Sequence, residues 1–333
     1  MIPASVSSTI LEVTQATSIQ SIESVQTLWS GYGEIARVNL VGSQFESLIV
    51  KWVNPPVAAN HPRGWSTDQS HQRKLRSYQV ESCWYTKFSD RLSDTCRVAK
   101  CYQATAQGDQ HLFLLEDLDA AGFGDRRGRL DQAGVQSVLT WLAEFHATFM
   151  GCDAAGLWPV GTYWHLATRP DELAAIDDSQ PLKQFASLID QTLSTCPIQT
   201  LVHGDAKVAN FCFPEKASGC TRVAAVDFQY VGGGCGMKDV AYFLGSCLSE
   251  DQCDRDAESH LDFYFAKLAD ALSARNDLNV TGAEVESTWR PLYPIAWADF
   301  HRFLLGWCPG HQKLHAYTHR MTKEAIALLK QQK

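Results

Sequence analysis

Apolar and polar residues alternate in short runs over the first part of the chain. Three such runs, IQSIESVQTL, IARVNLV and ESLIVKWV, lie between residues 19 and 53 and are separated by the turn-forming sequences SGYG and GSQ. Alternation with a period of two is typical of strands that bury one face. The pattern therefore predicts an antiparallel sheet near the amino terminus.

The pattern changes to a helical period further along. A Pro- and Gly-rich segment, NPPVAANHPRGW, precedes DQSHQRKLRSYQVESCWYTKFSDRL at 68–92, in which apolar residues recur every three or four positions. RVAKCYQAT and HLFLLEDL then predict two more strands, and LDQAGVQSVLTWLAEFHATFM at 130–150 predicts a long helix. Helical patterns dominate again after residue 250. The chain is sheet-rich in front and helix-rich behind, which indicates the α+β class, and 333 residues suffice for roughly two lobes.

Composition excludes several classes of function. The chain has 45% hydrophobic residues, a net charge of -8 and no block of like charges, so we expect a globular protein that binds no nucleic acid. No apolar run is long enough to span a membrane, and the amino terminus has neither a basic segment nor a long apolar one. The 11 cysteines are odd in number and lack C-x-x-C spacing, which favours reduced thiols in the cytoplasm.

One stretch carries a candidate for phosphate chemistry. HGDAKVANF begins at residue 203, and VDFQ, with Asp227 at its second position, follows on the far side of a predicted hairpin formed by NFCF, PEKASGC and RVAAVDF. Phosphoryl transfer needs a metal ion, a cation on the phosphates and a carboxylate aimed at the attacking hydroxyl. We expect Asp205 to orient that hydroxyl and accept its proton, and Asn210 and Asp227 to bind Mg²⁺. Lys207 would stabilise charge in the transition state.

A purely structural interpretation of this stretch is a loop Asp that caps a helix, followed by a turn Asn. The sequence HGDAKVANF together with VDFQ nevertheless resembles the catalytic loop and metal motif of the aminoglycoside phosphotransferase and choline kinase superfamily, the small-molecule branch of the protein-kinase-like fold. LLEDL at 114, LAEFHATF at 142 and GGGCGMKDVAYFL at 232 are most similar to ecdysteroid kinase-like proteins, and the resemblance spans about residues 29–243.

The resemblance implies a two-lobed kinase-like fold with an antiparallel-sheet N-lobe and a mainly helical C-lobe. We place the nucleotide-binding lobe at 1–116 and the catalytic and substrate-binding lobe at 117–333. Lys51 stands in the apolar run LIVKWV, where a lone ammonium is costly unless an anion meets it. It would bind the α- and β-phosphates of ATP, with Glu81 as its partner. The alternatives are a solvated edge-strand lysine and an ordinary helical glutamate.

The turn WSGYGEIA places Gly31, Gly33 and Ala36 where a kinase glycine loop would lie, and the alternative is an ordinary hairpin turn. The same spacing is a weak dinucleotide-binding fingerprint, but that fingerprint needs a helix directly after the turn, and IARVNLV predicts a strand. By analogy with kinases, backbone groups near Glu116 and Leu118 would hold adenine. Asp239 in GMKDVAYFL resembles the aspartate that supports the catalytic loop in this family. The alternative is a local role, in which its negative charge stabilises the amino-terminal turn of its own helix.

The acceptor is expected between the hairpin and the C-terminal helices. Aromatic residues at helical spacing there belong more often to a core than to a pocket. As a pocket they would suit a quaternary ammonium or a flat, sterol-like molecule, and the resemblance favours an uncharged hydroxyl on a hydrophobic molecule. These residues are Trp289, Tyr293, Trp297, Phe300 and Trp307.

Polar residues near the acceptor region have simpler interpretations. The acidic segment SEDQCDRDAESHLD is either a solvated helix face or the lining of a cationic pocket, and His146 is expected to be a core residue. His311, His315 and His319 would align on a helix, but no carboxylate or Cys completes a zinc site, which favours a partly exposed face.

The sequence thus predicts an ATP- and Mg²⁺-dependent kinase that phosphorylates a hydroxyl group of a small organic molecule. The alternatives are a nucleotide-binding pseudokinase or scaffold, a protein kinase and, more remotely, a Rossmann oxidoreductase. The absence of an Ala-Pro-Glu sequence after VDFQ counts against a protein kinase.

Overall fold

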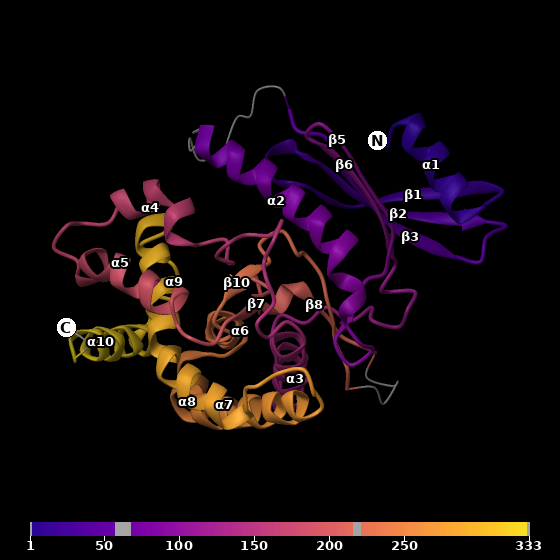
Figure 1. Ribbon diagram of the computed structural model, residues 1–333. Coiled ribbons are helices and arrows are strands. Elements are labelled where there is room, and N and C mark those ends of the chain that lie inside the picture. Colours follow the sequence, from indigo (N-terminus) through magenta and orange to yellow (C-terminus); the bar gives the residue numbers. More distant parts are fainter. Residues whose placement is uncertain (1, 57–67, 216–220, 332–333) are drawn as a thin grey trace.

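The computed structural model describes residues 2–56, 68–215 and 221–331 (Figure 1). The sequence near the amino terminus forms a five-stranded antiparallel sheet in the order β1-β2-β3-β6-β5. These strands are β1 (Ser18–Thr27), β2 (Gly33–Val41), β3 (Ser47–Val53), β5 (Cys101–Gln107) and β6 (Gln110–Glu116). The sheet predicted from alternation is therefore confirmed.

Both faces of this sheet are covered, because successive strand residues point to opposite sides. On one face, Val50 and Leu114 pack with Val6 and Ile10 of helix α1 (Ala4–Thr14). On the other face, Phe113 packs with residues of helix α2 (Asp68–Lys87). Figure 1 shows α1 on the outer side of the sheet and α2 between the sheet and the helical part of the molecule.

The helical part, or C-lobe, follows β6. Short strands β7 and β10 pair with each other, and β8 pairs with β9, which also pairs in parallel with β4 from the sheet-rich half. The helices are α3 (Gln132–Thr148), α4 (Pro170–Ala174), α5 (Pro181–Ser194), α6 (Met237–Cys247), α7 (Glu250–Ser273), α8 (Gly282–Trp289), α9 (Tyr293–Trp307) and α10 (Ala316–Gln331). The short strands are β4 (Arg97–Val98), β7 (Thr200–Val202), β8 (Phe211–Cys212), β9 (Ala224–Ala225) and β10 (Gly232–Gly234).

A stack of aromatic rings joins the two lobes. Trp84 of α2 lies parallel to Phe228, with 4.4 Å between ring centroids, and contacts Phe145 of α3 at 5.7 Å. All three side chains are fully buried. Aromatic packing of this kind fixes α2 against the segment that carries Asp227, and this fixes the geometry of the space between the lobes.

The structure corrects several expected elements. The helix predicted for 68–92 ends at Lys87, RVAKCYQAT divides into β4 and β5, and the hairpin strands are only two residues each. Helix α10 begins at Ala316, so His311 and His315 precede it and the three histidines do not share one helix. They are nevertheless half-buried or exposed, in agreement with the prediction of a partly exposed face. Within residues 2–56, 68–215 and 221–331, no helix is long and apolar enough to cross a membrane.

Candidate active site

A cavity of about 970 Å³ lies between the sheet, α2 and the C-lobe, within the size range of small-molecule sites. Its wall brings together almost all the residues predicted to bind the nucleotide or the metal or to act in catalysis, although they come from both halves of the chain. Gly31 and Gly33 are the exceptions, and their neighbours Trp29 and Tyr32 line the cavity instead. The predicted residues in the wall are Lys51, Glu81, Glu116, Leu118, Asp205, Lys207, Asn210 and Asp227.

Lys51 and Glu81 form a buried ion pair. β3 is the central strand of the sheet, so Lys51 cannot be a solvated edge residue, and its side chain points toward α2. Its Nζ lies 2.7 Å from both carboxylate oxygens of Glu81. Only 4% of Lys51 and 1% of Glu81 are exposed. Burial raises the pKa of Glu81, and the charge of Lys51 opposes this rise.

The loop that carries Asp205 is held by one carboxylate beneath it. Asp239, fully buried in the first turn of α6, accepts hydrogen bonds from the backbone N–H of His203 at 2.5 Å and of Gly204 at 2.9 Å. His146 Nε2 lies 3.2 Å from the same carboxylate, and its Nδ1 bonds the hydroxyl of Tyr264. His146 is thus a buried core residue, as predicted.

Gly204 explains why the loop needs glycine before its aspartate. Its φ angle is +79°, a region that side chains other than glycine rarely adopt. A Cβ at this position would lie 2.1 Å from the carbonyl oxygen of Tyr230. A glycine before Asp205 is therefore required by a close backbone approach between two loops.

Every carboxylate oxygen of Asp205 has a partner. Lys207 Nζ lies 2.9 Å and Asn210 Nδ2 3.0 Å from Oδ2, and the hydroxyl of Tyr242 donates to Oδ1 at 3.2 Å. Burial raises the pKa of Asp205, with the charge of Lys207 acting in the opposite sense. Sequence reasoning missed Tyr242, although it follows Asp239 by three residues on α6 and therefore shares its helix face.

Asp227 has the features of a metal ligand. Its φ angle is +70°, a strained value for a residue other than glycine, and its Oδ1 is buried with no hydrogen-bond partner among the described residues. Burial opposes ionisation of Asp227, but the charges of Lys51, Lys207 and Lys74 outweigh it and lower the pKa. An ionised, buried oxygen without a partner is costly unless a cation meets it.

Asn210 lies next to Asp227 through the hairpin. The backbone N–H of Val226 donates to the carbonyl of Asn210 at 3.0 Å. Asn210 Nδ2 donates to the backbone carbonyl and to the side chain of Asp205. The amide oxygen of Asn210 therefore faces away from Asp205. In the described part of the chain, no group of three or more His, Cys, Asp or Glu residues is arranged so that it could hold a metal ion. A site with two protein oxygen ligands leaves room for phosphates and water, as Mg²⁺ sites usually do. A closed structural site would surround its metal with protein ligands.

Lys74 is a further cation that the sequence did not reveal. It lies seven residues before Glu81 on α2, donates to Oε1 of Gln229 at 2.8 Å and lies 4.8 Å from the ring centroid of Tyr78. Burial lowers the pKa of Lys74 to about 8. The bond to Gln229 ties α2 to the segment that carries Asp227.

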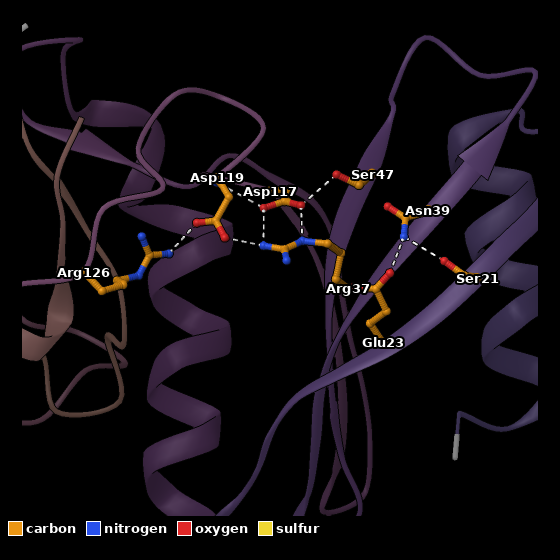
Figure 2. Close-up of polar contacts among 8 residues, drawn as sticks. All are labelled: Ser21, Glu23, Arg37, Asn39, Ser47, Asp117, Asp119 and Arg126. Atoms are coloured by element: carbon orange, nitrogen blue, oxygen red, sulfur yellow. Dashed lines mark hydrogen bonds and ion pairs between the residues drawn. The ribbon is translucent and has the colours of Figure 1, made fainter. Parts of the chain in front are cut away.

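The connection between the lobes is held by charged side chains (Figure 2). Arg37 of β2 donates to Asp117 at 2.6 Å and also contacts Asp119, which pairs with Arg126 at 2.7 Å. The hydroxyl of Ser47 donates to Asp117 at 2.7 Å. Sequence reasoning missed this network, which joins two strands of the sheet to the start of the C-lobe.

The expected adenine contacts are partly used by the protein itself. The backbone N–H of Glu116 donates to the carbonyl of Lys100, and the carbonyl of Leu118 accepts from Phe123, each at 2.8 Å. A contact with adenine at these residues would therefore use the carbonyl of Glu116 and the N–H of Leu118.

The aromatic residues proposed for the acceptor are mostly core. Trp289, Tyr293 and Trp297 are buried and do not line the cavity, and Phe300 packs in a cluster with Trp164. Trp307 lines the cavity, together with aromatic residues that sequence reasoning missed. The acidic segment at 249–262 contributes nothing to the wall. The additional aromatic lining residues on the C-lobe side are Tyr163, Tyr230, Tyr242 and Phe303.

This chain belongs to the ecdysteroid kinase-like family, whose model matches residues 44–154 and 167–276. It is accordingly a phosphotransferase with an alcohol group as acceptor. No curated protein is significantly similar to it.

Among solved structures, the amicoumacin kinase hAmiN in complex with AMP-PNP, Ca²⁺ and Ami is 14% identical, with a TM-score of 0.52 and coverage of 99% of this chain and 94% of that one. A microcompartment-associated aminopropanol kinase is 13% identical, with a TM-score of 0.49 and coverage of 99% and 97%. The choline kinase LicA from Streptococcus pneumoniae is 12% identical, with a TM-score of 0.44 and coverage of 99% and 98%. The likeness to the amicoumacin kinase confirms the two-lobed kinase-like fold.

Proposed function

We propose that this protein transfers the γ-phosphoryl group of ATP to a hydroxyl group of a small organic molecule, in a reaction that depends on Mg²⁺. One observation carries the proposal: Oδ1 of Asp227 is buried without a hydrogen-bond partner among the described residues, in the same cavity wall as Lys51, Asp205 and Asn210. A protein that only bound nucleotide would have no need of Asp205. We also propose that the nucleotide-binding lobe ends at residue 116.

The roles follow from the geometry. Lys51, held by Glu81, binds the α- and β-phosphates, and the backbone near Glu116 and Leu118 contacts adenine. Asp227 and Asn210 hold Mg²⁺, which when bound neutralises phosphate charge. Lys207 stabilises the charge that develops on the transferring group.

Asp205 orients the acceptor hydroxyl and takes up its proton as the new bond from oxygen to phosphorus forms. The bond between the γ-phosphorus and the bridging oxygen breaks, and ADP leaves. Burial raises the pKa of Asp205, which makes its carboxylate a better proton acceptor than a solvated one.

Two observations support the choice of partners and location. One similar solved structure, that of the amicoumacin kinase, contains AMP-PNP and Ca²⁺, an ATP-type nucleotide and a divalent cation. We propose a cytoplasmic location because all the described cysteines are free thiols.

The proposal is tested by ADP release from ATP and Mg²⁺ in the presence of a library of small alcohols, with wild type and Asp205→Asn. We expect at least one alcohol to stimulate ADP release by the wild type. The Asp205→Asn variant should retain binding of Mg·ATP and lose the stimulation. Asp109→Ala, at an exposed turn, is the control and should behave as wild type. Equal stimulation of Asp205→Asn would refute the assigned role.

A further inference from the structure

The place of the acceptor is marked by Oδ1 of Asp205. Tyr242 donates to this oxygen at 3.2 Å, and the same hydroxyl lies 3.3 Å from the hydroxyl of Tyr163. Both tyrosines line the cavity. If the proposed function holds, the acceptor lies against these two residues, on the C-lobe side of the catalytic carboxylate.

This end of the cavity is aromatic. The ring of Tyr163 lies edge-on to Phe303 at 5.4 Å and to Tyr230 at 5.9 Å, and Phe303 stacks on Trp307 at 5.6 Å. Thr162, just before Tyr163, has a φ angle of +110°, and its N–H donates to the carbonyl of Tyr230. A backbone held in this strained state fixes Tyr163 in place. Such a surface suits a flat, apolar molecule.

The carboxylates of the wall are unavailable to a cationic acceptor. Apart from the proposed proton acceptor Asp205 and the proposed metal ligand Asp227, each carboxylate of the wall has a basic partner within the described residues, so an ammonium group would find no other free anion there. The pairs are Lys51 with Glu81, Arg97 with Glu116, Arg37 with Asp117, and Arg126 with Asp119.

The acceptor end instead carries an arginine without an acidic partner. Arg73 of α2 donates to the carbonyl of Thr168 at 2.7 Å and to the hydroxyl of Ser70 at 3.1 Å, and no carboxylate in the described chain lies within ion-pair distance of it. Arg169 differs, because Glu172 binds it at 3.0 Å. Burial and the charge of Arg169 lower the pKa of Arg73, and the charges of Glu172 and Asp171 do not outweigh them.

Arg73 faces a different part of the cavity from its neighbour Lys74. Arg73 binds the carbonyl of Thr168, and the next residue, Arg169, lies 5.8 Å from the ring centroid of Tyr163 and 5.2 Å from that of Phe303. Lys74 instead donates to Gln229, two residues after the proposed metal ligand Asp227. Arg73 is therefore placed to bind the acceptor, and Lys74 to bind phosphate.

We infer that the acceptor is a flat hydroxylated molecule that carries a carboxylate, and that Arg73 binds this carboxylate. This inference rests on the proposed function and narrows it, because the family resemblance alone favours an uncharged acceptor. A guanidinium matches a carboxylate in shape and can form two parallel hydrogen bonds with it. Charge-assisted hydrogen bonds of this kind discriminate strongly against ligands that lack the anion.

Three matched alcohols test the inference: p-(hydroxymethyl)benzoate, p-(hydroxymethyl)benzamide and p-(hydroxymethyl)benzylamine. They have similar size and differ in charge. For the wild type, we expect kcat/KM to be higher for the benzoate than for the benzamide by about 10- to 100-fold, mostly through a lower KM. The benzylamine should be the poorest acceptor, because like charges in a binding site are unfavourable.

Variants of Arg73 separate recognition from folding. Arg73→Met should bring kcat/KM for the benzoate down to the benzamide value and leave the benzamide value within about threefold, whereas Arg73→Lys should keep part of the preference. Arg255→Met, on the exposed face of α7, is the matched control and should keep the full preference.

Equal kcat/KM for benzoate and benzamide, a preference for the benzylamine, or an unchanged ratio in Arg73→Met would overturn the inference. So would failure of the benzoate to react while the wild type still binds Mg·ATP and phosphorylates another alcohol. If the wild type binds no Mg·ATP, the proposed function itself fails, and the inference fails with it.

Discussion

Substitutions in the buried ion pair of Lys51 and Glu81 test its contribution to folding stability separately from its role in nucleotide binding. Both side chains are almost fully buried, and Lys51 Nζ is 2.7 Å from each oxygen of Glu81. Removal of one partner leaves the other charge without compensation, which costs about 3–5 kcal/mol for buried pairs. We therefore expect Glu81→Leu to lower the free energy of unfolding by about this amount.

Lys51→Met should cost less than Glu81→Leu. Burial already raises the pKa of Glu81, and without Lys51 the carboxyl group can take up a proton and become neutral. In the double variant both charges are replaced by apolar side chains near the rings of Tyr78 and Phe113, and such replacements are often neutral or stabilising. The double variant should therefore be more stable than Glu81→Leu by at least about 2 kcal/mol.

Urea unfolding followed by tryptophan fluorescence measures these stabilities, and the thermal shift caused by Mg·ATP measures nucleotide binding. The double variant should be folded and show no Mg·ATP shift, because the phosphate ligand is lost. Lys87→Met, at the exposed end of α2, is the control and should change stability by less than about 0.5 kcal/mol. A double variant as unstable as Glu81→Leu, or one that keeps the Mg·ATP shift, would refute this reasoning.

Three further predictions concern the supports of the site and the C-terminal helices. Asp239→Ala removes the acceptor of two backbone hydrogen bonds from His203 and Gly204. It should lower the free energy of unfolding by about 3–5 kcal/mol and abolish turnover. An unchanged urea midpoint would contradict the bracing role of Asp239. Gly204→Ala should fail to fold stably, which expression and melting would show, because its Cβ would meet a carbonyl oxygen at 2.1 Å. Burial lowers the pKa of His301 to about 4 from 6.5, so the unfolded chain binds the extra proton and stability falls as pH drops from about 6.5 to 4. Over this pH range, the free energy of unfolding of His301→Gln should fall by up to about 3 kcal/mol less than that of the wild type, as measured by urea titrations at each pH. Parallel pH curves for the two proteins would contradict the prediction.

The catalytic loop and hairpin were predictable because their residues are close in sequence. The spacing from Asp205 to Asn210 is fixed by one loop, and a hairpin must bring Asp227 back beside Asn210. Lys51 was predictable for another reason: an ammonium in an apolar central strand requires a partner, and alternation determines which face it occupies.

Other features depend on contacts that leave no local pattern. Arg37 and Asp117 are 80 residues apart, and neither sequence neighbourhood indicates the other. The aromatic residues of α9 share one helical period, and only the packing of the neighbouring helices decides that Trp297 joins the core whereas Trp307 faces the cavity. Helix α1 was missed because Ser and Thr, which are weak helix formers, separate its apolar residues.

Thermal unfolding with and without Mg²⁺ and ATP tests the central claim most directly. A ligand at 100 times its dissociation constant stabilises the folded state by about 2.7 kcal/mol. The wild type should show this shift only when Mg²⁺ and ATP are both present, and Asp227→Asn, which keeps the shape and tolerates positive φ, should show none. A shift of equal size in Asp227→Asn, or no shift in the wild type, would contradict the account.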